Sequence, residues 1–554
     1  MPREAALGKG DSVMKSTMMH YPLTIAHLLE RANRYFPGVE VVSLLPDKSL
    51  HRTDLGRLTT RARALCQALL GAGLKPGDRV ATLMWNHYAH FEAYLGIPAA
   101  GGVLHPLNAR LHHGDLEYIV NHAEDRFLIV DSALLPRFEE VKDKVNLERV
   151  FVAALGDASV PAGYENYEDL LAQGSDALAG YPQLDEYQPS GMCYTSGTTG
   201  RPRGVVYSHR STIIHTYDVC LAGGIRPSDV GLPIVPMFHA LAWVWPYIAA
   251  LVGAKTVFAG PHTDPESIIE LCRAEGVTFA SGVPTVWLRV LEALQAAPEQ
   301  ARLRPGMRLL IAGSAVPESL LRAYDALGVE VIHSWGMTEV TSCGTAAILK
   351  PYFKDLPEDE RYRLRAKQGY PLGFVEARVA VEGGKPVAPD GQSIGELQVR
   401  GPYVSGSYFK MAPDAEKFTA DGWLRSGDVA TVDREGFIKI TDRSKDLIKS
   451  GGEWISSVDL ENAIMAHPDV AEAAVIAAPH PQWDERPLAF VVPKQGSTVT
   501  ADDIRRFIAD KFAKWWLPDD YVFIDAIPRS STGKFSKLTL RERYQSYFTS
   551  RARG

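Results

Sequence analysis

Cysteine is scarce in this sequence. The chain has five cysteines in 554 residues, an odd number, and they are scattered with no Cys-x-x-Cys spacing. Such a pattern suggests neither a disulfide framework nor a zinc site. We therefore expect a protein of a reducing compartment, the cytoplasm.

Long apolar runs are also missing. The first twenty residues are polar and irregular and lack the apolar core of a signal peptide, although methionines at positions 14, 18 and 19 leave the natural start open. No other run is long enough to span a bilayer. We expect no integral membrane segment.

The chain also lacks an excess of positive charge. The formal net charge is −7, which argues against a general nucleic-acid binder. Any site for a phosphate group must then be local. Internal repeats and low-complexity tracts are absent as well.

What the chain does have is length and apolar content. At 554 residues and 46% hydrophobic residues, it exceeds what one hydrophobic core organises, so several structural units are expected. Residues 79–84 and 127–131 are predicted to be buried strands, and residues 55–74 to be a helix. Their alternation is typical of an α/β fold in which helices cover parallel sheets.

The sequence changes character towards the C-terminus. From about residue 373 to 440, short segments are separated by glycine and proline, as in GELQVRGP at 395–402, which predicts a small β-barrel-like subdomain. Beyond it we expect a small α+β domain. Its predicted elements are helices over residues 457–467 and 501–511 and strands over residues 471–477 and 488–493.

A hinge is predicted between these units. The segment DRSKDLIKSGG at residues 442–452 is rich in charge and ends in paired glycines, which favours a hinge followed by a tight turn. We therefore divide the chain into an N-terminal domain of residues 1–441, a linker of residues 442–447 and a C-terminal domain of residues 448–554.

The strongest chemical signal is the loop YTSGTTGRPRG at residues 194–204. Its glycines let backbone N–H groups approach an oxyanion, and its hydroxyls add donors or reach a metal. The loop looks built for a polyphosphate, the plain alternative being a surface turn. Gly-Lys-Ser/Thr is absent, which argues against the ordinary P-loop NTPases.

Further motifs follow this loop. Glu339 stands at a predicted strand end, where a carboxylate is awkward to bury without a cation. Taken alone, Trp243 and Trp335 are also compatible with core packing, and Lys449 and Lys534 with a solvated surface. The motifs are VPMFHALAW at 235–243, IAGSAVP at 311–317, HSWGMTE at 333–339, LRSGD at 424–428, IKSGGEWISS at 448–457 and IPRSSTGKF at 527–535.

Together these motifs resemble the adenylate-forming superfamily of acyl-CoA synthetases, luciferases and peptide-synthetase adenylation domains. The resemblance extends over nearly the whole chain and is closest to bacterial long-chain and medium-chain fatty acyl-CoA synthetases. It implies a large N-terminal domain of two αβα sheet subdomains plus the small β subdomain, and a mobile C-terminal domain. It also implies ATP and Mg²⁺ as cofactors, coenzyme A as co-substrate, and a homodimer.

The resemblance assigns most motif residues to the nucleotide. Asp428 would accept both ribose hydroxyls, since a carboxylate offers two acceptors, and Arg443 would close on the same ribose. Lys445 would be a hinge residue that also reaches the nucleotide. The adenine contacts implied are Gly313, His333, Ser334 and Trp335. The phosphate contacts implied are Thr195, Ser196, Gly197, Thr198, Thr199, Gly200 and Arg203, with Arg203 where the family has lysine. Thr338 is a further implied nucleotide contact.

The metal and the reacting groups are assigned in the same way. Glu339 is the implied Mg²⁺ ligand with Thr195 as second contributor, because hard oxygen ligands suit that ion. Lys534 would contact the acyl carboxylate and the α-phosphate as charge builds during adenylation. Lys449 and Trp454 would contact the adenylate and line the route of the thiol.

The acyl side is implied by the motif at residues 235–243. His239 is counted among the catalytic residues as a wall or gate near the adenylate, because an ionised carboxylate has no proton for a base to remove. Trp243 resembles the indole that gates the fatty-acid tunnel in bacterial long-chain members.

These assignments imply a ligase that joins a medium-chain or long-chain fatty acid to coenzyme A through an acyl-adenylate, releasing AMP and pyrophosphate. A hinge motion would exchange Lys534 for the face with Lys449 and Trp454 between the two steps. One alternative is a short-acid ligase of the same mechanism, for example for 3-methylthiopropionate. Another is a noncatalytic acyl-binding or nucleotide-binding homologue. A luciferase or peptide-synthetase module is disfavoured, because no carrier domain is attached and the motifs are closest to those of CoA ligases.

Overall fold

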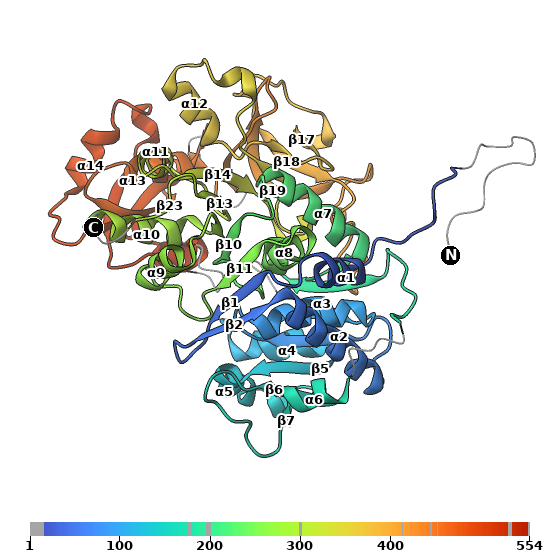
Figure 1. The fold of residues 1–554 in the computed structure, drawn as a ribbon. Helices are drawn as coiled ribbons and strands as arrows, with labels where there is room; N and C mark the ends of the chain where they lie inside the picture. The colour runs from blue at the N-terminus through green and yellow to red at the C-terminus, as the bar shows by residue number, and fades with distance from the viewer. Residues whose placement is uncertain are drawn as a thin grey trace, which may run out of the picture.

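The computed structural model describes residues 16–174, 180–195, 201–297, 302–412, 414–443, 446–450, 453–529 and 535–551. Within these residues the strands form four sheets of seven, nine, four and five strands. Figure 1 shows the N-terminal third below, the middle of the chain in the centre and the C-terminal segment at the upper left. None of the described helices is both long and apolar enough to cross a membrane.

The seven-stranded sheet has the order β7-β6-β5-β3-β4-β8-β9. Its strands pair in parallel except β8 and β9, which are antiparallel. The predicted strands at 79–84 and 127–131 are confirmed as β3 and β5. The bounds are β3 Arg79–Leu83, β4 Val103–Pro106, β5 Asp125–Asp131, β6 Arg149–Ala153, β7 Glu165–Asn166, β8 Pro189–Tyr194 and β9 Gly204–Ser208.

The nine-stranded sheet has the order β16-β15-β14-β13-β12-β10-β11-β1-β2. Its five neighbouring strand pairs from β1 to β14 are parallel, so the carboxyl ends of β10, β12, β13 and β14 share one edge. The bounds are β1 Glu40–Leu44, β2 Leu50–Asp54, β10 Val230–Pro233, β11 Lys255–Phe258, β12 Phe279–Gly282, β13 Arg308–Ala312, β14 Glu330–Trp335, β15 Thr345–Ala346 and β16 Tyr370–Pro371.

Helix α3 (Tyr88–Ala99) packs between the two large sheets. It contacts β1 of one sheet and β3, β4 and β8 of the other, and its residues from Ala89 to Ala99 are all buried. A helix that is buried on every side and mostly apolar is expected in such a central position. Its buried carboxylate, Glu92, is paired with Arg61 of α2 (Leu55–Gly71), 2.6 Å from Nε.

The outer helices complete the layers. The predicted helix over residues 55–74 is confirmed as α2, which begins after the Asp54 cap and ends at Gly71, because Gly73 turns left-handed. The others in the N-terminal domain are α1 Ile25–Tyr35, α4 His113–Ala123, α5 Leu135–Glu139, α6 Tyr167–Gln173, α7 His209–Ala222, α8 Trp245–Val252, α9 Pro265–Glu275, α10 Pro284–Ala296, α11 Glu318–Ala326 and α12 Glu358–Arg365.

The predicted β subdomain is a four-stranded antiparallel sheet. Its strands follow in chain order as β17 (Glu376–Ala380), β18 (Gly395–Arg400), β19 (Leu424–Val432) and β20 (Ile438–Arg443). The segment between β18 and β19 returns to the large sheets, where the Phe409 amide donates to the Gly204 carbonyl of β9 at 2.8 Å.

The C-terminal α+β unit is also confirmed. Its sheet pairs β22-β21-β24-β23, with β25 beside β24. The helices end two or three residues earlier than predicted, and the strands run longer. The bounds are α13 Ser457–Met465, α14 Ala501–Ile508, α15 Lys537–Tyr544, α16 Tyr547–Arg551, β21 Ile448–Ser450, β22 Glu453–Ile455, β23 Val470–His480, β24 Asp484–Pro493 and β25 Asp520–Phe523.

Candidate active site

The predicted site residues that follow β10, β13 and β14 lie at the carboxyl edge of the nine-stranded sheet. The turns after β10, β13 and β14 lie there because parallel strands end at one edge, which is where α/β sheets commonly bind ligands. The β8–β9 hairpin of the other sheet meets this edge, since the Tyr207 hydroxyl donates to the Thr338 carbonyl at 2.9 Å.

The two ends of the predicted phosphate loop are fixed to each other. The Thr195 amide donates to the Arg203 carbonyl at 2.9 Å, and the Arg203 amide donates to Thr195 Oγ1 at 3.2 Å. The Arg203 guanidinium lies over the Tyr408 ring, 5.1 Å from its centroid. Ser196, Gly197, Thr198, Thr199 and Gly200 lie outside the described residues, so their roles stay predictions.

Trp335, Asp428 and Arg443 come together from three strands. The Trp335 indole Nε1 donates to Asp428 Oδ2 at 2.8 Å, and Arg443 Nε lies 3.5 Å from Asp428 Oδ1. Asp428 and Arg443 are register partners of β19 and β20. A carboxylate, a guanidinium and an aromatic face are thus presented side by side.

The other predicted adenine contacts lie next to Trp335. Ile311 and Ala312 of β13 are paired with His333 and Ser334 of β14, and Gly313 follows with a φ of +100°, which favours glycine. The Ser334 hydroxyl donates to the Thr345 carbonyl at 2.6 Å. Burial lowers the pKa of His333 to about 4, so its imidazole is neutral at physiological pH.

Glu339 lies on the short turn after β14, with 6% of its surface exposed. The Tyr408 hydroxyl donates to Glu339 Oε1 at 2.6 Å, and the Ser405 amide donates to the Glu339 carbonyl at 2.7 Å. Tyr408 is itself buried. Motif reasoning missed Tyr408, because a tyrosine between β18 and β19 gives no sign of a carboxylate partner 69 positions earlier.

This arrangement fits a hard divalent cation. The described residues contain no group of three or more His, Cys, Asp or Glu side chains that could hold a metal unaided. Mg²⁺ does not need such a cage, because it is usually bound by one or two carboxylates together with substrate phosphates. Glu339, with one oxygen engaged by a hydroxyl, keeps acceptor capacity for such an ion.

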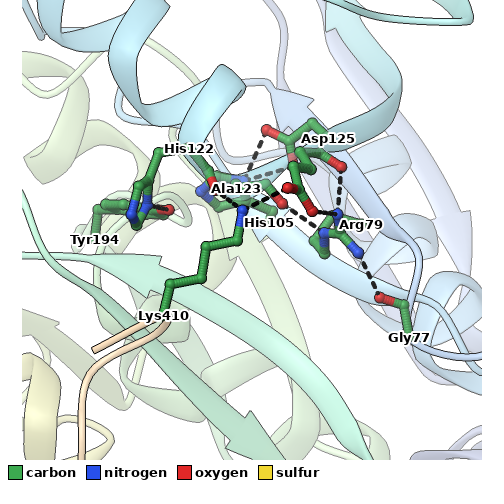
Figure 2. Close-up of polar contacts among 9 residues, drawn as sticks. Gly77, Arg79, His105, His122, Ala123, Asp125, Tyr194 and Lys410 are labelled. Atoms are coloured by element: carbon green, nitrogen blue, oxygen red, sulfur yellow. Dashed lines mark hydrogen bonds and ion pairs between the residues drawn. The ribbon is translucent and has the colours of Figure 1, made fainter. Parts of the chain in front are cut away.

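Tyr194, the first residue of the phosphate loop, packs against His122 of α4 and His105 of β4. Its hydroxyl lies 2.7 Å from His122 Nδ1. Figure 2 shows Lys410 reaching the same place, where its Nζ donates to the His122 carbonyl. Arg79 of β3 fixes the turn between α4 and β5 by donating to the Ala123 carbonyl at 2.6 Å.

The predicted acyl motif begins with a segment held by buried polar side chains. Asn86 donates to the carbonyls of Pro233 and Val235 and accepts from the Met237 amide. The Tyr94 hydroxyl donates to the Met237 carbonyl. His239 is half-buried after this segment.

The motif ends in a left-handed turn. Ala240, Leu241, Ala242, Trp243 and Val244 have φ values of 42°, 52°, 56°, 49° and 59°. All five are buried. Each non-glycine residue in this conformation costs about 1–2 kcal/mol, so packing must compensate for substantial strain. Strain of this kind concentrates at functional sites.

Lys449 and Trp454 lie on a surface hairpin of the C-terminal sheet. They are register partners of β21 and β22, and Lys449 Nζ lies 5.9 Å from the Trp454 ring centroid. Trp454 is 48% exposed. The structure therefore places these two predicted residues on one exposed face.

The predicted linker begins inside a strand. Asp442 and Arg443 are the last residues of β20. Asp442 is buried, and its carboxylate accepts from the Ser457 amide and hydroxyl at 2.8 and 2.6 Å. Lys537 of α15 donates to the same hydroxyl and lies 2.7 Å from Glu461. Lys445 and Lys534 lie outside the described residues, so the hinge, its boundaries and the role of Lys534 stay predictions.

Comparison with known proteins decides the family. Residues 29–409 match the AMP-binding enzyme family, and residues 459–534 match the AMP-binding enzyme C-terminal domain. The chain belongs to the AMP-binding enzyme family. The resemblance seen in its motifs is thereby confirmed, and so is the expectation of an enzyme.

Relatives of this AMP-binding enzyme match it from end to end. A long-chain-fatty-acid–CoA ligase of Thermus thermophilus is 46% identical over 98% of this chain and 99% of its own. A 3-methylmercaptopropionyl-CoA ligase of Ruegeria pomeroyi is 42% identical over 97% and 100%. The crystal structure of ATP-bound MatB from Rhodopseudomonas palustris, 26% identical, covers 95% of this AMP-binding enzyme and 100% of MatB with a TM-score of 0.81.

Proposed function

We propose that this protein is an AMP-forming ligase that joins a medium-chain or long-chain fatty acid to coenzyme A through an acyl-adenylate. The observation that carries the proposal is the junction of Glu339, Trp335 and Asp428 beside the ends of the phosphate loop. It offers a carboxylate for a metal, an indole for a base and acceptors for a ribose where β19 meets the end of β14. The end-to-end likeness to a long-chain ligase supports the substrate class.

The first half-reaction requires an acid oxygen to attack the α-phosphorus of ATP. Asp428 and Arg443 would orient the ribose, and Arg203 would face the phosphates from the end of the loop. Glu339 and Thr195 would hold Mg²⁺, which supplies neutralisation of phosphate charge. Lys534 would stabilise the charge that builds between the two reacting anions.

The second half-reaction requires the thiol of coenzyme A to displace AMP from the acyl group. Lys449 and Trp454 would face the adenylate in this step, after the C-terminal domain turns about Asp442 and Lys445. Their place on one exposed hairpin supports this proposal.

We also propose that the protein is a homodimer and lies in the cytoplasm. The five cysteines, all free thiols, support a reducing compartment.

Product analysis tests the reaction class. The purified protein, given a fatty acid, coenzyme A and Mg·ATP, is expected to yield acyl-CoA, AMP and pyrophosphate, and to catalyse carboxylate-dependent ATP/pyrophosphate exchange without coenzyme A. Release of ADP and orthophosphate instead would refute the proposal, and absence of exchange with every acid would favour a noncatalytic binder.

A short-acid ligase is the second candidate, favoured by the 42% identity to the 3-methylmercaptopropionyl-CoA ligase. A series of acids from four to eighteen carbons separates the two. Our proposal predicts the highest kcat/KM at medium or long chains, whereas a steep preference for four-carbon acids would support the second candidate.

Lys534→Ala tests the division of labour between the two half-reactions. Loss of a preorganised donor should slow adenylation about 100-fold to 1000-fold. Thioester formation from supplied acyl-AMP should be largely spared, because Lys534 would be withdrawn in that step. Equal loss in both half-reactions would contradict the hinge assignment.

A further inference from the structure

Three consecutive residues between β18 and β19, Tyr408, Phe409 and Lys410, each hold a different part of the proposed nucleotide site. The Tyr408 hydroxyl binds the Glu339 carboxylate at 2.6 Å. The Phe409 amide binds the carbonyl of Gly204, the last residue of the phosphate loop, at 2.8 Å. Lys410 binds the turn that supports Tyr194, the first residue of that loop. We call these three residues the clasp.

The tyrosine end of the clasp is buried. Tyr408 is 4% exposed and Glu339 is 6% exposed, so their hydrogen bond is shielded from water. The ring of Tyr408 also carries the guanidinium of Arg203 on its face, 5.1 Å from the centroid. One side chain therefore restrains both a proposed metal ligand and a proposed phosphate contact.

The middle of the clasp packs closely on the loop's end. A Cβ added to Gly204 would lie 3.2 Å from the Phe409 Cβ and 3.1 Å from the Tyr194 ring. Such contacts would be tighter than ordinary van der Waals packing, so a side chain larger than that of glycine would force its neighbours to move. Tyr194 and Gly204, the first and last residues of the phosphate loop, are paired directly across β8 and β9, and Phe409 is bonded to the Gly204 side of this pair.

The lysine end anchors the clasp to the seven-stranded sheet. Lys410 adopts a φ of +56°, and its Nζ lies 3.0 Å from the His122 carbonyl and 2.6 Å from Glu124 Oε1. The His122 imidazole contacts the Tyr194 hydroxyl at 2.7 Å. As Figure 2 shows, Arg79 ties the same turn to β3. The turn that Lys410 binds is therefore itself held to the seven-stranded sheet.

We propose that the clasp sets the position of the Glu339 carboxylate relative to the two described ends of the phosphate loop, and that Tyr408 is a positioning residue for metal-dependent ATP binding. The inference rests on the proposed function, because it takes Glu339 as the Mg²⁺ ligand. Groups that hydrogen-bond a ligating carboxylate orient it, and their loss typically costs 10-fold to 100-fold in metal affinity or activity.

The test compares two buried tyrosines of the same segment. Tyr408→Phe removes the hydroxyl on Glu339. Tyr403→Phe is the matched control, because the Tyr403 hydroxyl donates to the buried carboxylate of Asp218 at 2.7 Å, on α7 and outside the site. Both variants lose one buried hydrogen bond to a carboxylate, so a general loss of packing affects them alike.

The readout is equilibrium binding of ATP by calorimetry, without fatty acid, once in excess Mg²⁺ and once in EDTA. In the wild type, Mg²⁺ should tighten ATP binding. The tightening is measured as the ratio of the Kd for ATP in EDTA to the Kd in Mg²⁺. In Tyr408→Phe this ratio should fall about 10-fold, whereas the Kd in EDTA should change little. Tyr403→Phe should keep the wild-type ratio. An unchanged ratio in Tyr408→Phe, or an equal loss in both variants, would overturn the role of Tyr408.

ATP/pyrophosphate exchange on the same proteins separates this inference from the proposed function. The rate of ATP/pyrophosphate exchange by Tyr408→Phe should recover towards the wild-type rate as the Mg²⁺ concentration is raised. A positioning residue affects the affinity for Mg²⁺ more than it affects the rate at saturating Mg²⁺. If the wild type shows no exchange with any acid, the proposed function fails. If the wild type exchanges and the Mg²⁺ dependence of Tyr408→Phe is normal, the clasp alone fails.

Lys410→Met tests the anchor. Its ion pair is partly exposed, with side-chain exposures of 39% for Lys410 and 63% for Glu124, so the Mg²⁺-dependent tightening should fall by about two-fold to five-fold. Lys410→Arg keeps the charge and should restore most of it. If Lys410→Met binds Mg·ATP like the wild type, Lys410 has no share in the clasp.

Discussion

Glu339 and Trp243 both lie on turns that follow parallel strands of the nine-stranded sheet, β14 and β10, at the same edge. The supports of the two turns differ. Hydrogen bonds from Tyr207 and Tyr408, both distant in sequence, hold the Glu339 turn. The Trp243 turn consists of five buried left-handed residues within the apolar core.

This difference follows the chemistry proposed for each side. The charge that develops during adenylation must be stabilised by groups at defined positions. A hydrogen bond is directional, so it can hold a carboxylate at such a position. An alkyl chain offers no such point, and a pocket recognises it through shape and volume. We therefore expect changes at the Glu339 turn to alter the rate of adenylation, and changes at the Trp243 turn to alter the choice of acid.

Glu339→Gln should have the largest effect. The amide keeps the shape and can still accept a hydrogen bond from Tyr408, but the negative charge is lost. Adenylation, measured by ATP/pyrophosphate exchange, should fall on the order of 100-fold to 1000-fold.

The control for this variant is Asp218→Asn. Asp218 is also a buried carboxylate that accepts a tyrosine hydroxyl, but it stands on α7 away from the predicted site residues. Its exchange rate should stay within a few-fold of the wild type. Similar losses in both variants would show that the Glu339 effect comes from folding, not from charge at the site.

Trp243→Phe should have an intermediate effect, confined to acid selectivity. The smaller ring enlarges the proposed acyl pocket. The ratio of kcat/KM between long and short acids should therefore change about 10-fold, which is typical of pocket changes of this size. The KM for ATP should be unchanged. Competition between acids of two chain lengths measures the ratio directly.

Trp245→Phe is the matched control for Trp243→Phe. Trp245 starts α8, stacks on Phe279 and donates to Thr256, so its loss should lower the unfolding temperature and leave the selectivity ratio alone. Equal shifts in selectivity for both variants would remove Trp243 from its proposed place at the acyl wall.

Sequence reasoning found the elements and residues that carry local signals. Glycine and hydroxyl spacing marked the phosphate loop. The family resemblance, and not a local signal, pointed to Trp335, Asp428 and Arg443, three residues that do lie together. The helix over residues 55–74 was predicted from its amphipathic pattern, and the observed helix ends three residues earlier, where Gly73 turns left-handed.

Two features of the site had no such signal. The hydroxyl of Tyr408 finds its partner only because the segment between β18 and β19 folds back onto the large sheets. The left-handed turn is formed by alanine, leucine, tryptophan and valine, which disfavour positive φ. Local preference there points away from the observed backbone, and tertiary packing overrides it.

The smallest expected effect concerns that strain. Ala242→Gly and Ala249→Gly remove the same methyl group from fully buried alanines, one in the left-handed turn and one in the right-handed helix α8. In α8, glycine should cost about 0.5–1 kcal/mol. In the turn, glycine relieves about 1–2 kcal/mol of backbone strain, which offsets the loss of the methyl group.

The unfolding temperature of Ala249→Gly should therefore fall, while that of Ala242→Gly stays level or rises, as measured by calorimetry on the two variants in parallel. Because glycine also lets the turn leave its left-handed form, Ala242→Gly should broaden the range of acids accepted, with adenylation of the preferred acid retained. Equal destabilisation of the two variants would mean that the turn stores no strain, and the contrast with the Glu339 turn would then rest on hydrogen bonding alone.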